Sequence, residues 1–235
     1  MAALFYAPAI AQQAFLPEEE ARHCLQVLRY QKGDTILVVD GKGYFWEAII
    51  TNAQVKHCSL EIKKQSFDDA HLRDYYLHLA IAPTKNIDRM EWLVEKSTEI
   101  GIDEISFLQC QRSERKEVKI ERLEKVAVQA MKQSQKAFLP KINGIAKLKD
   151  FLIAQKNYET KLIGYVPSDT ESKNFLHFLQ KSNKVCMLVG PEGDFTEQEV
   201  QEAQLQGFEV VSLGKSVLRT ETAGLAICFA MAHKI

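Results

Sequence analysis

The sequence lacks the features of exported and membrane-spanning proteins. No run of apolar residues approaches the roughly 20 that a transmembrane helix needs. No Lys or Arg precedes Arg22, so the stretch APAIAQQA has no basic segment before it, as a signal peptide would require. With 235 residues and 46% apolar side chains, the chain can form one large domain or two modest ones. We therefore expect a soluble, cytoplasmic protein.

The chain also lacks any cysteine pattern typical of metal sites or disulfide frameworks. Its five cysteines are scattered, and no two of them form a C-x-x-C motif. We therefore expect reduced, buried thiols and no bound metal.

A strong net charge is missing as well. The formal charge is −1, so electrostatics alone do not indicate a nucleic-acid partner. Between Arg112 and Lys141, however, nine Lys or Arg stand against four Glu, a local excess of +5. Such a run is usually a solvated helix face, and contact with phosphates is the alternative.

The first 70 residues read as short strands with turn signals. Gly41 and Gly43 suit a hairpin connection between two of these strands. A short helix is expected over residues 17–29, with acidic residues in its first turn. The expected strands cover residues 35–40, 44–50 and 59–64. The sum predicts a small β-barrel or sandwich with one helix.

From Tyr75 onward, strands and helices alternate. This alternation predicts a parallel sheet that is covered by helices on both faces. Expected strands cover 75–82, 102–110, 161–167, 184–190 and 208–214, and expected helices cover 87–100, 120–135, 172–181, 196–206 and 220–234. The polar segment 65–74 is a plausible linker, so we expect domains at 1–70 and 75–235.

Two glycine-bearing loops follow expected strands. In LVGPEGDFTEQEV, Thr196 and Glu199 form a capping box that begins a helix, which leaves GPEGDF as the loop. Gly190 and Gly193 can adopt positive φ and let a ligand approach the backbone. In LGKSVLRTETAGLA, the chain leaves a strand at Gly214 and enters an apolar helix whose polar first turn needs partners.

Ligands of open α/β sheets bind beyond the carboxyl ends of the strands. The two loops together therefore suit the wall of one ligand site, although ordinary strand-to-helix turns remain the alternative. The known phosphate motifs fail, because Glu209 replaces the first glycine of a P-loop and no G-x-G-x-x-G follows a strand. The G-x-x-G at 190–193 leaves a strand, whereas an RNA-clamping loop would join two helices. Nucleoside triphosphates and dinucleotides are disfavoured, and the residues alone leave the ligand open.

Six stretches carry a resemblance to a known family: GPEGDFTEQEV, LGKSVLRTETAGLA, HCLQVLRYQKGD, TKNIDRMEWLVEKSTEIGIDEI, QRSERK and KQSQKAFLP. They resemble the RsmE family, bacterial 16S rRNA uridine-N3 methyltransferases of the SPOUT class, over nearly the whole chain. The resemblance implies a PUA-like RNA-binding β-barrel at the N-terminus and an α/β domain with a C-terminal trefoil knot. It further implies S-adenosylmethionine as cofactor, 16S rRNA of the small ribosomal subunit as substrate, and a homodimer with active sites completed across the interface.

The resemblance also assigns cofactor contacts to both loops. These residues are Leu188, Val189, Gly190, Glu192 and Gly193 in the first loop, and Leu213, Gly214, Ser216, Leu218, Arg219 and Thr220 in the second. Asp194 stands where many relatives have glycine, which we expect to change the stiffness of the loop slightly. Lys136 stands where many relatives have Arg, so a bidentate phosphate contact is not expected there.

The chemistry of the implied reaction suggests catalytic residues. A neutral imide nitrogen has no free lone pair, so N3 must lose its proton to a base or through water. Alternatively, a cation could stabilise the charge that develops on O2 or O4. Arg219 is the first choice for that cation, and its competing role is to pair with Glu221 or to cap backbone carbonyls. Glu192 and Glu221 are candidates for the base or for orienting groups, although a carboxylate is a weak base unless burial raises its pKa.

Several basic residues are candidates for RNA contact, with a solvated charge as the alternative for each and, for His23, a partly buried ring whose hydrogen bonds are satisfied within the protein. They are Arg22, His23 and Arg29 in the first domain, and Lys85, Arg89, Arg112, Arg115 and Lys136 in the second. Trp92 suits packing or a dimer surface.

Two other classes of function remain open. A non-catalytic RNA-binding protein that retains the fold would bind no cofactor. The hypothesis of an α/β enzyme that acts on a small molecule would not explain the β-rich domain or the basic segment.

Overall fold

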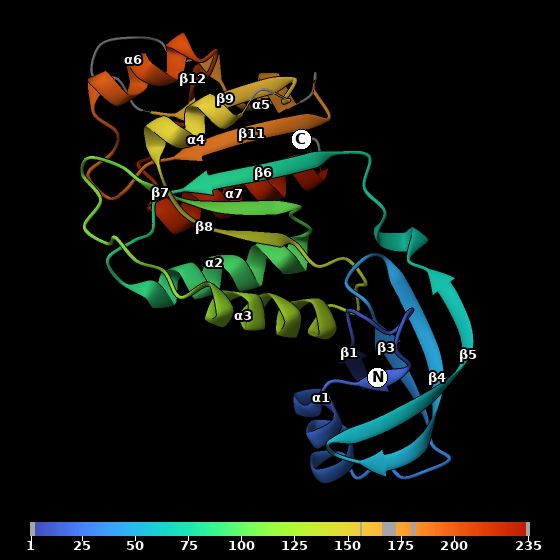
Figure 1. Ribbon diagram of the computed structural model, residues 1–235. Helices are drawn as coiled ribbons and strands as arrows, with labels where there is room; N and C mark the ends of the chain where they lie inside the picture. The colour runs from blue at the N-terminus through green and yellow to red at the C-terminus, as the bar shows by residue number, and fades with distance from the viewer. Residues whose placement is uncertain (1–2, 156, 166–172, 180–181, 234–235) are drawn as a thin grey trace. The chain divides into compact units, whose positions relative to one another are not determined.

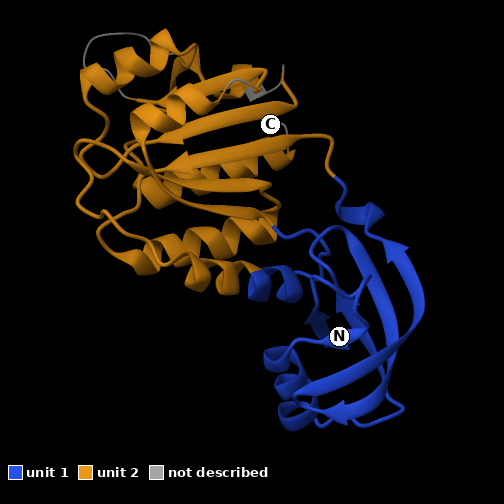
Figure 2. Ribbon diagram, in the orientation of Figure 1, with its two compact units in different colours: residues 1–72, 128–139 blue, residues 73–127, 140–235 orange. Residues whose placement is uncertain are grey.

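The computed structural model describes residues 3–155, 157–165, 173–179 and 182–233. The chain forms two compact units (Figure 1, Figure 2). Unit 1 contains residues 1–72 and 128–139, and unit 2 contains residues 73–127 and 140–235. The first passage of the chain between the units thus falls within the polar segment 65–74. The return of residues 128–139 to unit 1 had no counterpart in the sequence patterns.

Unit 1 is built on a five-stranded sheet in the order β1-β3-β4-β5-β2. The pair β1–β3 is parallel and the other pairs are antiparallel. Its strands are β1 (Leu4–Tyr6), β2 (Phe15–Leu16), β3 (Thr35–Val39), β4 (Tyr44–Gln54) and β5 (His57–Phe67). The three longer strands were predicted; β1 and β2 are too short to show an alternating pattern.

One helical segment and one hairpin follow the local sequence signals in unit 1. Helix α1 (Glu18–Arg22) continues as the π-helical turn η1 (His23–Val27), and the 3-10 turn η2 (Asp69–His71) follows β5. The predicted hairpin joins β3 to β4 through Gly41 and Gly43, which have φ of 76° and 103°. These positive angles are the reason glycine is needed at both positions.

The segment 128–139 completes the core of unit 1. Met131 and Ala137 pack in one buried cluster with Leu4 and Val39. The backbone N–H of Ala137 donates to the Asp68 carboxylate at 2.9 Å. These contacts join residues distant in sequence, so no local pattern could reveal them.

Unit 2 contains a seven-stranded sheet in the order β10-β12-β9-β11-β6-β7-β8, and every pair in it is parallel. This confirms the predicted parallel α/β architecture. The strands are β6 (Tyr76–Ile81), β7 (Glu104–Gln109), β8 (Lys141–Lys147), β9 (Thr160–Gly164), β10 (Lys173–Asn174), β11 (Lys184–Val189) and β12 (Glu209–Ser212).

Helices cover both faces of this sheet (Figure 1). Helix α7 packs against α2, β6 and β11, whereas α4 packs against α6, β7 and β8. The helices are α2 (Ile87–Ile100), α3 (Ile120–Gln133), α4 (Leu148–Ala154), α5 (Leu176–Leu179), α6 (Glu197–Leu205) and α7 (Thr220–His233). Helix α3 begins in unit 2 and ends in unit 1.

Three elements of unit 2 differ from the sequence-based expectation. The helix expected over 172–181 is replaced by β10 and the single turn α5, with residues 172, 180 and 181 outside the described residues. Strand β8 and helix α4 were not predicted. In β8 only Ile142 is fully buried, because the strand lies at the edge of the sheet, so the alternation of a half-buried strand is weak.

All five cysteines are free and buried, as expected from their scattered spacing. Burial raises the pKa of each thiol, so they remain protonated and unreactive at neutral pH. Among the described residues, no helix is both long and apolar enough to cross a membrane.

A buried polar network lies in the sheet of unit 2. The His78 ring lies 2.8 Å from Tyr158 Oη through Nδ1 and 2.8 Å from Ser106 Oγ through Nε2. Tyr76 Oη donates to Glu104 at 2.6 Å. Burial lowers the pKa of His78 to about 4, although the Glu104 carboxylate opposes the shift. The ring is therefore neutral in the folded protein at pH 7.

Acid should destabilise the fold through His78. Its folded pKa lies below the ordinary value of 6.5, so the unfolded chain binds the proton first as the pH falls. The stability contributed by the neutral ring is complete above pH 6.5 and is lost toward pH 4. We expect a loss of about 2 kcal/mol in the free energy of unfolding between pH 7 and pH 5 from this residue.

Urea unfolding at both pH values measures this effect. His78→Gln should remove that part of the pH dependence, whereas the exposed His57→Gln should keep it. An unchanged pH dependence in His78→Gln would contradict the assignment.

Candidate functional site

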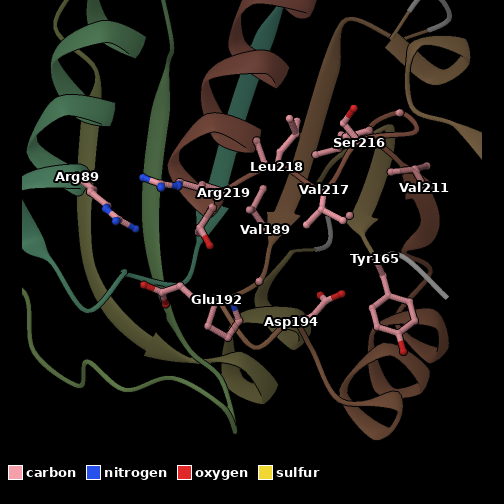
Figure 3. A pocket seen from close by; sticks show the side chains of 17 residues that line it. Arg89, Tyr165, Val189, Glu192, Asp194, Val211, Ser216, Val217, Leu218 and Arg219 are labelled. Atoms are coloured by element: carbon pink, nitrogen blue, oxygen red, sulfur yellow. The ribbon is translucent and has the colours of Figure 1, made fainter. Parts of the chain in front are cut away.

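A cavity of about 330 Å³ lies at the carboxyl ends of β9, β11 and β12, within unit 2 (Figure 3). Most of its wall comes from the ends of these three neighbouring strands and from the residues that follow them, and α2 adds Arg89. The lining residues are Arg89, Gly164, Tyr165, Val189, Gly190, Pro191, Glu192, Asp194, Val211, Leu213, Gly214, Ser216, Val217, Leu218, Arg219, Thr220 and Ala223. The position and size are those of a small-molecule site in an open α/β sheet.

The loop after β11 is a tight bend with one strained residue. Asp194 has φ of +60°, which only a few per cent of residues other than glycine adopt. Its side chain accepts a hydrogen bond from the Phe195 N–H at 2.7 Å, and its own N–H donates to the Pro191 carbonyl at 2.9 Å. Helix α6 then begins with the predicted capping box of Thr196 and Glu199.

The loop after β12 relies on a glycine backbone. Gly214 has φ of +128°, a region that is essentially closed to other residues. Val217 is 91% exposed, although it also lines the cavity. The loop ends where α7 begins with Thr220 and Glu221, and both of these polar residues are buried.

Charged side chains surround one end of the cavity. The guanidinium groups of Arg89, from α2, and Arg219, from the loop before α7, point toward each other (Figure 3). The Glu192 carboxylate lies on the same wall, and its Oε1 accepts a hydrogen bond from the Lys85 N–H at 3.0 Å. Both charge signs are therefore available to a ligand.

Glu221 pairs with Arg89 rather than with Arg219 in the part of the chain that the structure describes. Its Oε1 lies 3.7 Å from Arg89 Nε, and its buried Oε2 has no hydrogen-bond partner among the described residues. The competing role of Arg219, pairing with Glu221, is therefore not what the structure shows. A second cavity lies beside this pair and shares Arg89 and Arg219 with the main one; Asp88, Trp92, Glu221 and Thr222 complete its lining.

The structure brings together most of the residues that the resemblance assigned to the cofactor. Nine line the main cavity: Val189, Gly190, Glu192, Leu213, Gly214, Ser216, Leu218, Arg219 and Thr220. Two do not. Leu188 is fully buried in the core beneath the loop, and Gly193 faces the side chain of Arg112.

Tyr165 and Asp194 line the cavity but were not among the residues predicted to contact the cofactor. Tyr165 directly follows β9, so the rule that ligands bind beyond strand ends could have identified it. Arg89, predicted to contact RNA, lines the cavity as well.

The other basic residues predicted to contact RNA in the second domain have different surroundings. Lys85 is exposed and pairs with Glu114 at 3.0 Å. Arg112 and Arg115 both donate hydrogen bonds to backbone carbonyls. Lys136 belongs to unit 1 and is 9% exposed, and its contact with RNA stays a prediction.

The three remaining candidates lie on the surface of unit 1. Arg22 pairs with Glu18 at 2.9 Å, one helical turn away. His23 and Arg29 are exposed, and Arg29 has φ of +61° just after the end of the helical segment. Across the described residues, no group of His, Cys, Asp and Glu side chains is arranged to hold a metal ion.

Comparison with known proteins adds independent information. A family model described as "RNA methyltransferase domain" matches residues 72–232, and one described as "RNA methyltransferase PUA domain" matches residues 16–63. The chain is similar to a probable rRNA-methyltransferase from Porphyromonas gingivalis, with 42% sequence identity and a TM-score of 0.85 to its crystal structure. The match covers 96% of this chain and 95% of that chain.

Two further proteins carry a more specific name. A ribosomal RNA small subunit methyltransferase E from Neisseria gonorrhoeae, crystallised with S-adenosyl methionine, is 30% identical, with coverage of 99% of this chain and 98% of that chain and a TM-score of 0.85. A protein of the same name from Bacillus subtilis is 25% identical over 227 residues, which span 92% of this chain and 88% of that protein.

Gly214 offers a test of the loop geometry. Gly214→Ala should lower the free energy of unfolding by about 1 to 3 kcal/mol, because alanine is strained at this backbone angle although the space for its methyl group is open. Gly144→Ala is a matched control, since the space at Gly144 is also open and its φ is not positive. Denaturant unfolding compares the two variants, and equal stabilities would show that the loop relaxes without cost.

Proposed function

Because this chain belongs to the RNA methyltransferase family, we propose that it transfers a methyl group from S-adenosylmethionine to N3 of a uridine in 16S rRNA of the small ribosomal subunit. The observation that carries the proposal is the cavity bounded by the loops after β9, β11 and β12. Residues 75–235 would hold the catalytic site, and residues 1–70 would help bind RNA in the cytoplasm.

The chemistry of the cavity suits this cofactor. Val189, Leu213 and Leu218 offer apolar surface to an adenosyl group, and the neighbouring glycines allow close approach to backbone N–H and C=O groups. The carboxylates of Glu192 and Asp194 are on the same wall, where they complement the positive charge of a sulfonium and an amino group. The nine lining residues named above are the proposed contacts.

The acceptor would enter beside Arg89 and Arg219, where the main cavity meets the second one. Methylation of N3 displaces a proton, and negative charge develops on the uracil carbonyls as that proton leaves. Arg219 would stabilise this charge, because its guanidinium is permanently charged. Glu192 and Glu221, which line the main and the second cavity, are the proposed groups that would accept the proton or orient the base.

Contact with RNA would involve exposed basic residues of both units. Arg22, His23 and Arg29 are available in unit 1, and Lys85 and Arg89 in unit 2. Since the whole chain carries a formal charge of −1, these local positive charges would have to supply the attraction to phosphate.

A second copy of the chain is the proposed partner for an apolar surface of unit 2. Helix α7 is apolar on its outward side as well as on its buried side, and Phe229 there is 49% exposed. Trp92 is 41% exposed on the adjacent helix α2. Exposed aromatic side chains on neighbouring helices are typical of an interface, so we propose that these helices form the homodimer contact.

Arg219 provides the test of the proposed reaction. The full-length protein is mixed with labelled S-adenosylmethionine and small ribosomal subunits from cells that lack the modification, and the methyl group is then mapped. Arg219→Ala should lower kcat by about 10²- to 10³-fold, the usual loss when a group that stabilises developing charge is removed. Arg122→Ala is the matched control, because Arg122 is exposed on α3 and pairs with Glu91.

Each other outcome has a definite meaning. Label on N3 with a fully active Arg219→Ala protein would keep the function and remove this role for Arg219. Label on another base would correct the substrate. Neither label nor cofactor binding would favour the alternative, a non-catalytic RNA-binding protein that retains the fold.

The dimer surface is tested by sedimentation velocity at micromolar concentration. Phe229→Glu should convert a dimer into a monomer, because it buries an unpaired charge at the proposed contact. Leu205→Glu serves as the control, since Leu205 is 83% exposed on α6, which packs on the other face of the sheet. A monomeric wild-type protein, or a Phe229→Glu dimer, would exclude this surface as the interface.

A further inference from the structure

Arg112 holds two backbone carbonyls of the loop that lines the main cavity. Its Nη1 donates to the Gly193 carbonyl at 2.7 Å and to the Phe195 carbonyl at 3.4 Å. The aliphatic stem of Arg112 also packs on Gly193, where an added Cβ would lie 3.4 Å from Arg112 Cβ and Cδ. The guanidinium is therefore hydrogen-bonded to the backbone on both sides of Asp194.

Asp194 is the residue in this loop that needs such support. Its φ of +60° is unfavourable for a residue with a side chain, and the position lines the cavity. The hydrogen bonds within the loop, from Asp194 N–H to Pro191 and from Phe195 N–H to Asp194, do not fix its outer carbonyls. Arg112 supplies the contacts that hold those carbonyls in place.

Arg112 is itself held by its neighbours in the segment after β7. The Gln111 N–H donates to Glu199 Oε1 at 2.7 Å, and Glu199 is the residue that caps α6 through its other oxygen. The Cys110 N–H donates to Ser113 Oγ at 3.0 Å. Arg112 thus extends from an anchored backbone and not from a free loop.

A ring of contacts connects this segment to a third loop. Arg115 donates through Nε to the Thr84 carbonyl at 3.1 Å and through Nη2 to the Lys85 carbonyl at 2.6 Å. The Lys85 N–H in turn donates to Glu192 Oε1 at 3.0 Å, which returns to the cavity loop. The loops after β6, β7 and β11 therefore brace one another at the carboxyl edge of the sheet.

From these contacts we infer that Arg112 is a positioning residue that holds the loop GPEGDF in the shape that receives the cofactor. Arg115 supports the same loop indirectly, through Lys85 and Glu192. The inference rests on the proposed function for the identity of the cofactor. It changes the role of both arginines from phosphate contact to support of the cavity wall. Two of the three cations of QRSERK thus donate to backbone carbonyl oxygens of unit 2.

The test measures the affinities for cofactor and for RNA separately, on the full-length protein. Isothermal titration with S-adenosylmethionine, without RNA, should show a Kd at least tenfold higher for Arg112→Ala than for wild type. Arg112→Lys should recover part of the affinity, because an ammonium can still donate to one of the two carbonyls. Binding of a 16S rRNA fragment should change less than twofold. Lys116→Ala is the control on the same segment and should leave the cofactor Kd unchanged.

Hydrogen exchange of cofactor-free protein gives a second readout. The peptide covering residues 190–196 should exchange faster in Arg112→Ala than in wild type and Lys116→Ala, whereas peptides from β6 and β7 should not change. If Arg112→Ala changed neither the exchange of this peptide nor the cofactor Kd, the inference would be overturned. A loss of RNA binding in the same variant would then return Arg112 to the role of a phosphate contact. If wild type bound no S-adenosylmethionine, the proposed cofactor would be wrong, and the exchange data would still decide whether Arg112 positions the loop.

Discussion

The site depends on one constraint, the shared direction of the strands in unit 2. Because the sheet is wholly parallel, the loops that leave β6, β7, β9, β11 and β12 all emerge at one edge. To reach α7 from β12, the chain must pass the carboxyl ends of β9 and β11, since α7 packs on β11 and β6. The cavity lies where these connections cross, and the trefoil knot implied by the resemblance would lie at the same crossing.

The sequence predicted those elements whose stability is mostly local. Helix α2 has the bounds expected from its apolar spacing. The Asn86 side chain accepts a hydrogen bond at the start of the helix, and Gly101 ends it. Strands β6 and β11 are buried on both faces and read as continuous apolar runs. The return of residues 128–139 to unit 1 could not be predicted, because it depends on contacts of Met131 and Ala137 with residues more than 80 positions away.

Sequence patterns point to backbone features of the candidate site more readily than to the surroundings of its basic side chains. Gly214 could be identified because its φ of +128° favours glycine. Gly190 could be identified because the chain packs closely there: an added Cβ would lie 3.1 Å from the Phe195 ring. A long basic side chain carries no such signal. Arg112 donates to carbonyls, Lys136 is buried and Arg89 lines a cavity, although each is one cation in a basic part of the sequence. Only the packing of neighbouring loops decides among these environments.

The arrangement of Arg89, Arg219 and Glu221 beside the cavities does not maximise the stability of the folded protein. Two guanidiniums point toward each other, whereas closer pairing of Arg219 with Glu221 would have satisfied both groups. An unpaired buried carboxylate oxygen is costly, so the arrangement suits a group that arrives later. Uracil presents one N–H between two carbonyl oxygens, and a carboxylate oxygen beside arginine donors is the complement of that edge. The unpaired Glu221 oxygen beside the second cavity therefore suits an acceptor that completes the hydrogen bonding of the site when it binds.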